Sequence, residues 1–289
     1  MIIYGLDFTS APKRQKPITC AKCLLVDELL RVQDVECFTS FVQFEYFLQT
    51  NGPWITGLDF PFGQPRKLIE NLSWPLTWEG YVKLVGNMDK LGYEQLLKKY
   101  QQNRPYKDKR HFRLIDRKAD SRSPMQLDFV PVGKMFYQGA PRLLKSGASI
   151  LPNHPTDSNK LIVEAYPALV ARKIIGSQSY KNDTKSKQTV EQRDARIRII
   201  KGISSDKLEE IYGFCIRLSD EQIKLCIEEP SADLLDSVLC AIQATWAYTQ
   251  KNNHFGIPAE CDQLEGWIVD PAMEQTESLF PFFRDSVNE

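Results

Sequence analysis

Apolar residues in the first sixty positions form short runs that end at turn residues, a pattern typical of β-strands. These runs predict strands over residues 2–7, 18–26, 30–38 and 54–59. A short charged connection joins the second run to the third and favours a hairpin. A similar apolar run over residues 161–164 predicts a fifth strand much later in the chain.

Three stretches carry helix signals. Ser40 and Gln43 form a capping box ahead of apolar positions on one helical face, and Thr189 and Gln192 repeat this arrangement. Ser231 precedes a strong apolar pattern at helical spacing, which predicts a helix that faces a core. Strands reached through helices run parallel to the first strand, whereas a hairpin partner is antiparallel. The chain is therefore predicted to have an α/β fold with a mixed sheet.

Residues 66–158 interrupt this regular order. The stretch contains many turn residues and one expected helix over residues 77–101, so it is interpreted as an insertion. We expect a single domain over residues 1–271, with its core at about 1–65 and 159–271, followed by a C-terminal tail over 272–289.

The composition is typical of a soluble globular protein. Hydrophobic residues make up 42% and charged residues 26% of the 289 positions, which excludes a disordered or collagen-like chain. Lys and Arg together number 37, as do Asp and Glu, so nucleic-acid binding would have to come from local basic patches. No apolar run reaches the roughly 20 residues that cross a bilayer. Seven cysteines without a secretory signal pattern indicate a reducing, cytoplasmic location, and no membrane partner is expected.

Acidic residues follow the predicted parallel strands. The segments Gly-Leu-Asp-Phe at 5–8 and at 57–60 place Asp7 and Asp59 at equivalent strand ends, and Glu164 ends the fifth strand. Sites in open α/β sheets form at the carboxyl ends of the strands, so these three acids are expected at one edge. Asp233 and Asp236, three positions apart, share one face at the start of the last long helix.

Carboxylates crowded in a partly dry site repel one another unless a cation neutralises them. Oxygen ligands favour Mg²⁺ or Mn²⁺, and two such ions about 3.5–4 Å apart can hydrolyse a phosphodiester. The alternative is local: a strand-end aspartate can cap a turn or a helix, and Asp233 can complement a helix dipole. The residues alone leave both interpretations open.

Four short motifs resemble domain-of-unknown-function family 429, a predicted RNase H-like nuclease family, and the resemblance extends over residues 1–271. The motifs are Asp-Phe-Pro-Phe-Gly-Gln-Pro at 59–65, Val-Glu-Ala-Tyr-Pro at 163–167, Asp-Leu-Leu-Asp-Ser-Val-Leu-Cys-Ala at 233–241 and Glu-Gly-Trp-Ile-Val at 265–269.

The resemblance implies a five-stranded sheet in the order 3-2-1-4-5 with helices on both faces. It also implies catalytic metal ligands at Asp7, Asp59, Asp233 and Asp236, and a further catalytic acid at Glu164. The last-helix motif departs from the family in one place, because Ser237 stands where relatives often have alanine.

Two basic segments are candidates for binding nucleic acid. Residues 98–122 contain ten basic and three acidic side chains with interleaved aromatic residues, and a second basic stretch begins at Lys181. Basic groups neutralise phosphates, and aromatic rings stack on unpaired bases. The side chains expected to contact substrate are Lys109, Arg110, Arg113, Lys181, Lys185 and Arg193. A solvated surface remains the alternative, and Arg113 with Asp116 also fits the family's Arg-x-x-Asp pattern.

The chain lacks a glycine-rich dinucleotide fingerprint, a P-loop and a nucleophile elbow, which argues against nucleotide-cofactor redox chemistry and serine hydrolysis. The sequence therefore predicts an Mg²⁺- or Mn²⁺-dependent nuclease that acts on DNA or RNA. A catalytically silent RNase H-like module that binds nucleic acid or protein is the alternative. An ATP-dependent phosphotransferase of the actin and sugar-kinase type is less favoured, because it requires a second domain and glycine-rich phosphate loops.

Overall fold

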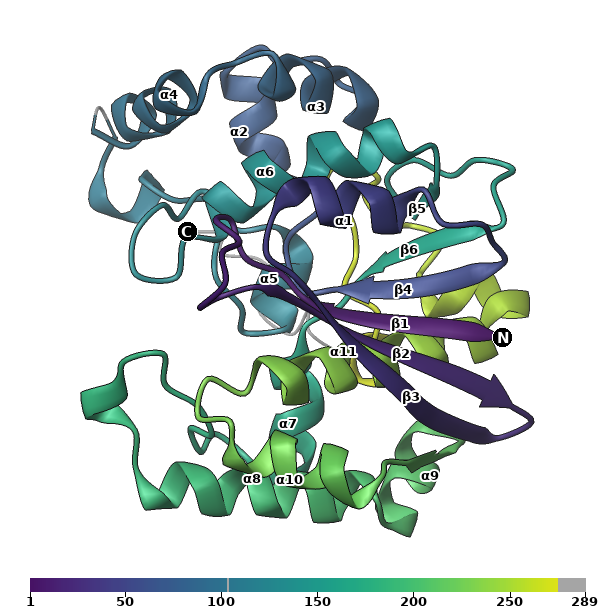
Figure 1. Ribbon diagram of the computed structural model, residues 1–289. Helices are drawn as coiled ribbons and strands as arrows, with labels where there is room; N and C mark the ends of the chain where they lie inside the picture. Colours follow the sequence, from purple (N-terminus) through teal and green to yellow (C-terminus); the bar gives the residue numbers. More distant parts are fainter. Residues whose placement is uncertain (103, 275–289) are drawn as a thin grey trace, which may run out of the picture.

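A seven-stranded mixed sheet forms the centre of the molecule, and helices cover both of its faces (Figure 1). The computed structural model describes residues 1–102 and 104–274. The strands are β1 (Ile2–Asp7), β2 (Ile18–Val26), β3 (Leu29–Phe38), β4 (Trp54–Leu58), β5 (Ser149–Leu151), β6 (Lys160–Glu164) and β7 (Cys215–Arg217). Their spatial order is β5-β6-β4-β1-β2-β3-β7. The predicted α/β class with a mixed sheet is confirmed.

Strand directions follow from the connections. The hairpin strands β1, β2 and β3 pair antiparallel, whereas β4 pairs parallel with β1 and with β6. The sheet has two strands more than the five predicted: β5 pairs parallel with β6, and β7 pairs parallel with β3. Each added strand has only three residues, which is too short to produce a recognisable alternation in the sequence.

One face of the sheet is covered by helices from the first and middle parts of the chain, seen above the sheet in Figure 1. They are α1 (Phe41–Leu48), α2 (Arg66–Asn71), α3 (Trp78–Gly86), α4 (Lys90–Gln102) and α6 (Val132–Ser146). Ser40 caps α1 as predicted, and its hydroxyl accepts from the Gln43 amide. Leu6 and Leu58 point to this face and pack in the same hydrophobic cluster as Phe136 of α6.

The opposite face is covered by later helices. They are α7 (Pro167–Ile175), α8 (Val190–Ile203), α9 (Asp206–Tyr212), α10 (Asp220–Glu228) and α11 (Asp233–Thr249). Helix α11 lies directly against β1, because a Cβ atom at Gly5 would stand 2.0 Å from the backbone oxygen of Ser237. At Gly57 of β4 a Cβ atom would stand 2.5 Å from the oxygen of Cys240. The two glycines therefore let the start of α11 approach the carboxyl ends of the strands.

The segment 66–158 is joined to the core. Phe136, Ala140 and Leu143 of α6 pack in the hydrophobic cluster of the sheet, and β5 extends the sheet itself. The single helix expected over residues 77–101 is two helices, α3 and α4, and the Asp89 carboxylate accepts from the Gly92 amide at 2.8 Å near the start of the second. The interruption reflects the preference of aspartate for helix starts.

The remaining elements are short. They are the 3₁₀ turns η1 (Tyr106–Asp108), η2 (Lys185–Lys187) and η3 (Lys251–Gly256), and the helices α5 (Leu114–Lys118) and α12 (Pro271–Glu274). Helix α12 crosses the predicted start of the tail at residue 272, and residues 275–289 of that tail lie outside the described residues. Within the described part of the chain, no helix combines the length and the apolar character needed to span a bilayer.

Candidate functional site

The register of β1 and β4 brings two of the predicted acids together. Leu6 pairs with Leu58, and the Asp59 amide donates to the Leu6 carbonyl at 3.1 Å, so Asp7 and Asp59 occupy equivalent positions on neighbouring strands. Side chains alternate along a strand. Gly5, two positions before Asp7, faces α11, and therefore the Asp7 carboxylate and its neighbour Asp59 also lie on the α11 side of the sheet.

The first turns of α11 add the other two predicted aspartates. Asp236 is fully buried and accepts hydrogen bonds from the Tyr180 hydroxyl at 2.6 Å and from the Lys181 ammonium. Asp233 is also buried, and its Oδ1 accepts from Lys16 Nζ at 2.6 Å. Asp7 interacts electrostatically with both helix carboxylates. The structure thus brings Asp7, Asp59, Asp233 and Asp236 together, and this set is called the acidic cluster below.

Burial makes the strand-end carboxylates difficult to ionise. It raises the pKa of Asp59 to about 7; the nearby Asp236 and Glu164 carboxylates add to this shift, and the Lys181 ammonium opposes it. Burial likewise raises the pKa of Asp7 well above its usual value, again against the influence of Lys181. No hydrogen bond joins either side chain to a residue in the described part of the chain. Both carboxylates therefore face the site without a direct partner.

Two lysines supply the positive charge of the site. Lys16, in the connection between β1 and β2, contacts Asp233 and also Asp183 at 3.0 Å. Lys181 lies in the segment after α7 and forms an ion pair with Asp236. Burial alone would lower the pKa of Lys181, but the nearby carboxylates of Asp236 and Asp7 raise it well above its usual value. Each lysine is therefore held as a cation among the carboxylates.

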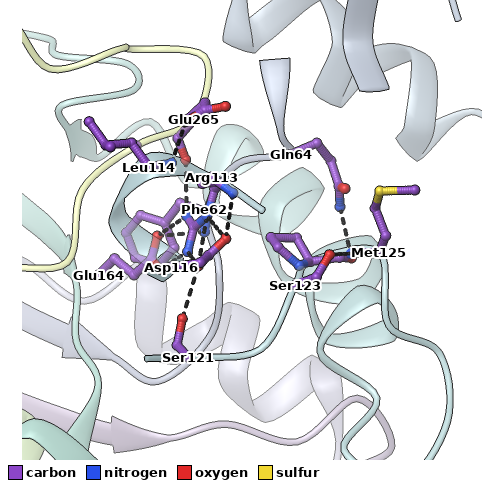
Figure 2. A network of polar contacts seen from close by, with 12 residues as sticks. Phe62, Gln64, Arg113, Leu114, Asp116, Ser121, Ser123, Met125, Glu164 and Glu265 are labelled. Carbon is purple, nitrogen blue, oxygen red and sulfur yellow. Dashed lines mark hydrogen bonds and ion pairs between the residues drawn. The ribbon is translucent and has the colours of Figure 1, made fainter. Parts of the chain in front are cut away.

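Glu164 lies near Asp59 but points away from the acidic cluster. It pairs in register with Leu58, one position before Asp59, so its side chain leaves the sheet on the face opposite to Asp7 and Asp59. There its carboxylate accepts from both terminal nitrogens of Arg113 at 2.6 and 2.7 Å and from the Phe62 amide at 2.9 Å. Figure 2 shows Glu164 and Asp116 turned toward the Arg113 guanidinium. This geometry supports a structural role for Glu164.

Arg113 is buried and does not offer its charge to a substrate. Its Nε and Nη2 donate to Asp116 at 2.7–3.1 Å, and Nη1 donates to Glu164 and to the Glu265 carbonyl at 2.9 Å (Figure 2). The Asp116 carboxylate also accepts from the Arg113 backbone amide at 3.0 Å, at the start of α5. The predicted contact between Arg113 and substrate is thus not observed. Two buried carboxylates, those of Asp116 and Glu164, accept the hydrogen bonds of its guanidinium instead.

The other predicted basic residues are dispersed. Lys109 and Arg110 line a groove of about 610 Å³ in segment 98–112, together with the exposed ring of Tyr106. Arg193 on α8 is paired with Glu228 of α10, and its Nε donates to that carboxylate at 3.0 Å. Lys185 begins η2. Of the six residues, the structure brings Lys181 alone to the acidic cluster among the side chains that it describes.

The donors of the acidic cluster fit a hard divalent cation by chemistry, because all of them are carboxylate oxygens. Within residues 1–102 and 104–274, no group of three or more histidine, cysteine, aspartate or glutamate side chains is already arranged around a metal position. Instead, the Lys181 ammonium forms an ion pair with Asp236, and its charge works to lower the pKa of Asp7 and of Asp59. A divalent cation would therefore have to take over the charge that Lys181 now supplies.

Lys16 and Tyr180 belong to the site, but neither carries a signal in the sequence. Their partners Asp233 and Asp236 lie 217 and 56 positions away along the chain, and no local pattern connects residues at such separations. The chain matches no known protein family, no curated protein and no solved structure with which it was compared. Function is therefore inferred from the geometry of the site itself.

Proposed function

We propose that this protein is an Mg²⁺- or Mn²⁺-dependent nuclease whose acidic cluster hydrolyses phosphodiester bonds in DNA or RNA. One observation carries the proposal: four aspartates from three distant segments converge on one sheet edge, and the two at the strand ends have raised pKa values and no hydrogen-bond partner in the described chain. Asp7 is buried and Asp59 is half-buried, and carboxylates removed from water without partners are unfavourable in a merely structural role. Perturbed pKa values in such a group are typical of functional sites.

The sheet supports the same proposal. The five strands expected from the sequence are neighbours in the order β3-β2-β1-β4-β6, with one further strand added at each edge. An RNase H-like domain of family 429 is expected to have this central order and helices on both faces. It is also expected to carry its acids on the first strand, the fourth strand and the last long helix; here Asp7 ends β1, Asp59 follows β4 and Asp236 lies at the start of α11.

Each residue of the site has a distinct task in this proposal. Asp7 and Asp59 hold the cations from the sheet, and Asp236 and Asp233 hold them from α11. Bound Mg²⁺ or Mn²⁺ supplies an activated water and stabilises the leaving oxygen. Tyr180 fixes the Asp236 carboxylate through its hydroxyl. Lys181, released from Asp236, becomes available to a substrate phosphate, and Lys109 and Arg110 bind the nucleic-acid backbone farther away.

Cleavage and Mn²⁺ uptake test the proposal together. The wild-type protein is compared with Asp7→Asn, Asp236→Asn and the control Asp157→Asn, whose side chain is exposed on a loop. Labelled single-stranded and duplex DNA and RNA are incubated with Mn²⁺, and calorimetry measures Mn²⁺ binding. We expect wild type and Asp157→Asn to bind Mn²⁺ and cleave, and the other two to lose both. Equal cleavage by wild type and Asp7→Asn would refute the assignment.

A silent binding module is the second candidate, and the two lysines favour it. Lys16 and Lys181 already neutralise Asp233 and Asp236, which is a stable arrangement without any metal. Such a module would bind nucleic acid in EDTA but show no Mn²⁺ uptake that depends on Asp7 or Asp236. The same calorimetric comparison therefore separates the two functions.

A further inference from the structure

A pocket of about 560 Å³ opens next to the acidic cluster. Asp59 belongs to both, and Lys181, the ion-pair partner of Asp236, also lines the pocket, so a molecule bound there would reach the cluster. The other walls come from residues 121–135, which end in α6, and from α7 with the segment that follows it. The volume falls within the range of about 300–1,000 Å³ that is usual for small-molecule sites.

Apolar and aromatic groups line much of the pocket. Val130 and Met135 contribute from one wall, and Ala168 and the half-buried Tyr166 from the other. Such a lining suits a flat, weakly polar group such as a nucleobase, which gains stability from contact with aromatic and aliphatic side chains.

Arg122 lines the same pocket and has no carboxylate partner in the described part of the chain. Arg122 is exposed, and no hydrogen bond or ion pair joins it to a residue in the described part of the chain. Arg172, on the other wall, differs because its Nη1 donates to the Ala119 carbonyl at 2.7 Å and its guanidinium lies 5.5 Å from the centre of the Tyr166 ring. Arg122 is therefore the arginine of this pocket that is available to a phosphate.

Phe129 belongs to the segment 121–135 that forms one wall of the pocket. It precedes the lining residue Val130, is fully exposed, and has a left-handed backbone with φ of 62°. A bulky side chain in this conformation is strained, and this ring contributes nothing to the core. Its exposed ring, in the same segment 121–135 as Arg122, provides a surface on which a base can stack.

We propose that the pocket binds one unpaired nucleotide of a nucleic-acid strand, next to the phosphate presented to the acidic cluster. The base lies against Tyr166, Val130 and Met135, Arg122 pairs with a flanking phosphate, and Phe129 stacks on the neighbouring base. A base inside a duplex is stacked and paired and must be extruded before it can enter such a pocket. The substrate is therefore single-stranded, or carries an extruded nucleotide. This inference rests on the proposed nuclease function and specifies its substrate class.

Binding in EDTA tests the pocket without requiring cleavage. Fluorescence anisotropy measures the affinity for labelled 12-nucleotide DNA and RNA strands and for the blunt DNA duplex of the same sequence. The variants are Ala168→Trp, which fills the pocket, and Arg122→Ala and Phe129→Ala, which change exposed side chains and leave the core intact. The control is Arg31→Ala, an exposed arginine level with Ile2 at the opposite end of the strands from Asp7.

We expect wild type and Arg31→Ala to bind single strands at least about tenfold more tightly than duplex. We expect Phe129→Ala to weaken strand binding by about five- to hundredfold, the range of one base–aromatic stack, and Ala168→Trp and Arg122→Ala to weaken it as well. Tighter binding of either RNA or DNA strands supports the pocket and identifies the strand type. Equal affinity for duplex and single strands, or wild-type affinity in both Arg122→Ala and Phe129→Ala, would overturn the inference.

The cleavage assay with Mn²⁺ separates this inference from the function on which it rests. Strand binding that depends on Arg122 and Phe129, without cleavage by the wild-type protein, supports the pocket and overturns the nuclease. Cleavage of duplex and single strands at the same rate, unchanged in Arg122→Ala and Phe129→Ala, supports the nuclease and overturns the pocket.

Discussion

Replacement of Arg113 by methionine tests whether this residue holds the fold together or contacts substrate. The Arg113 side chain is 1% exposed, and its partners Asp116 and Glu164 are 1% and 3% exposed. Methionine fills the space of the aliphatic stem but removes every guanidinium donor. Two buried carboxylates then lose the cation that neutralises them, and burial already raises the pKa of Glu164 even with Arg113 in place.

The expected loss is large on the scale of protein stability. Removing one partner of a buried ion pair lowers the free energy of unfolding by about 3–5 kcal/mol, and a typical domain has a total of about 5–15 kcal/mol. For large domains, where each kcal/mol corresponds to about 2 °C, the melting temperature falls by about 6–10 °C. Neutralising one carboxylate in Arg113→Met/Glu164→Gln recovers at least about 1 kcal/mol, a coupling energy usual for residues in contact.

Urea unfolding followed by tryptophan fluorescence measures these differences. Arg122→Met serves as the control, because it removes an exposed arginine that has no ion-pair partner in the described chain, and it is expected to unfold within about 0.5 kcal/mol of wild type. If Arg113→Met unfolds like Arg122→Met but loses affinity for nucleic acid, the structural interpretation of Arg113 is wrong and the substrate contact predicted from the sequence is right.

Three further predictions concern the acidic cluster in chelator-treated protein. Burial raises the pKa of Asp59 from 3.8 to about 7, so this group favours the folded state below pH 4 and that contribution is lost as the pH rises to 7. Between pH 4 and pH 7, the urea concentration at the unfolding midpoint should therefore fall less for Asp59→Asn than for wild type. If the midpoints of both proteins change equally with pH, the raised pKa of Asp59 is contradicted. Lys181→Met removes the ammonium that competes with a divalent ion, so calorimetry should show tighter Mn²⁺ binding than in wild type; weaker binding would mean that Lys181 helps to hold the ion. Gly5→Ala forces α11 away from β1, since the new Cβ would stand 2.0 Å from the Ser237 oxygen. We expect both stability and Mn²⁺ affinity to fall, and a variant equal to wild type in both would show that the helix can shift without affecting the site.

Much of the fold could be predicted from local patterns in the sequence. The strand runs, the Ser40 and Thr189 capping boxes and the acids at two equivalent strand ends were all predictable, because they depend on side-chain periodicity and on hydrogen bonds between residues three positions apart. Parallel pairing of the first and fourth strands followed from the helix between them. These features place Asp7 and Asp59 on one sheet edge without any knowledge of tertiary contacts.

Which of these groups share a site depends on contacts between distant segments. Glu164 resembles Asp59 in sequence, yet it pairs one register position earlier, and side-chain alternation turns it to the other face toward Arg113. Lys16 reaches Asp233 across 217 positions. A buried carboxylate pairs with a cation that tertiary packing brings close to it. The two residues are far apart in the chain, and no periodic sequence pattern connects them. The strands and the acids at their ends thus follow from local sequence patterns, whereas the partners of those acids follow from strand register and long-range packing.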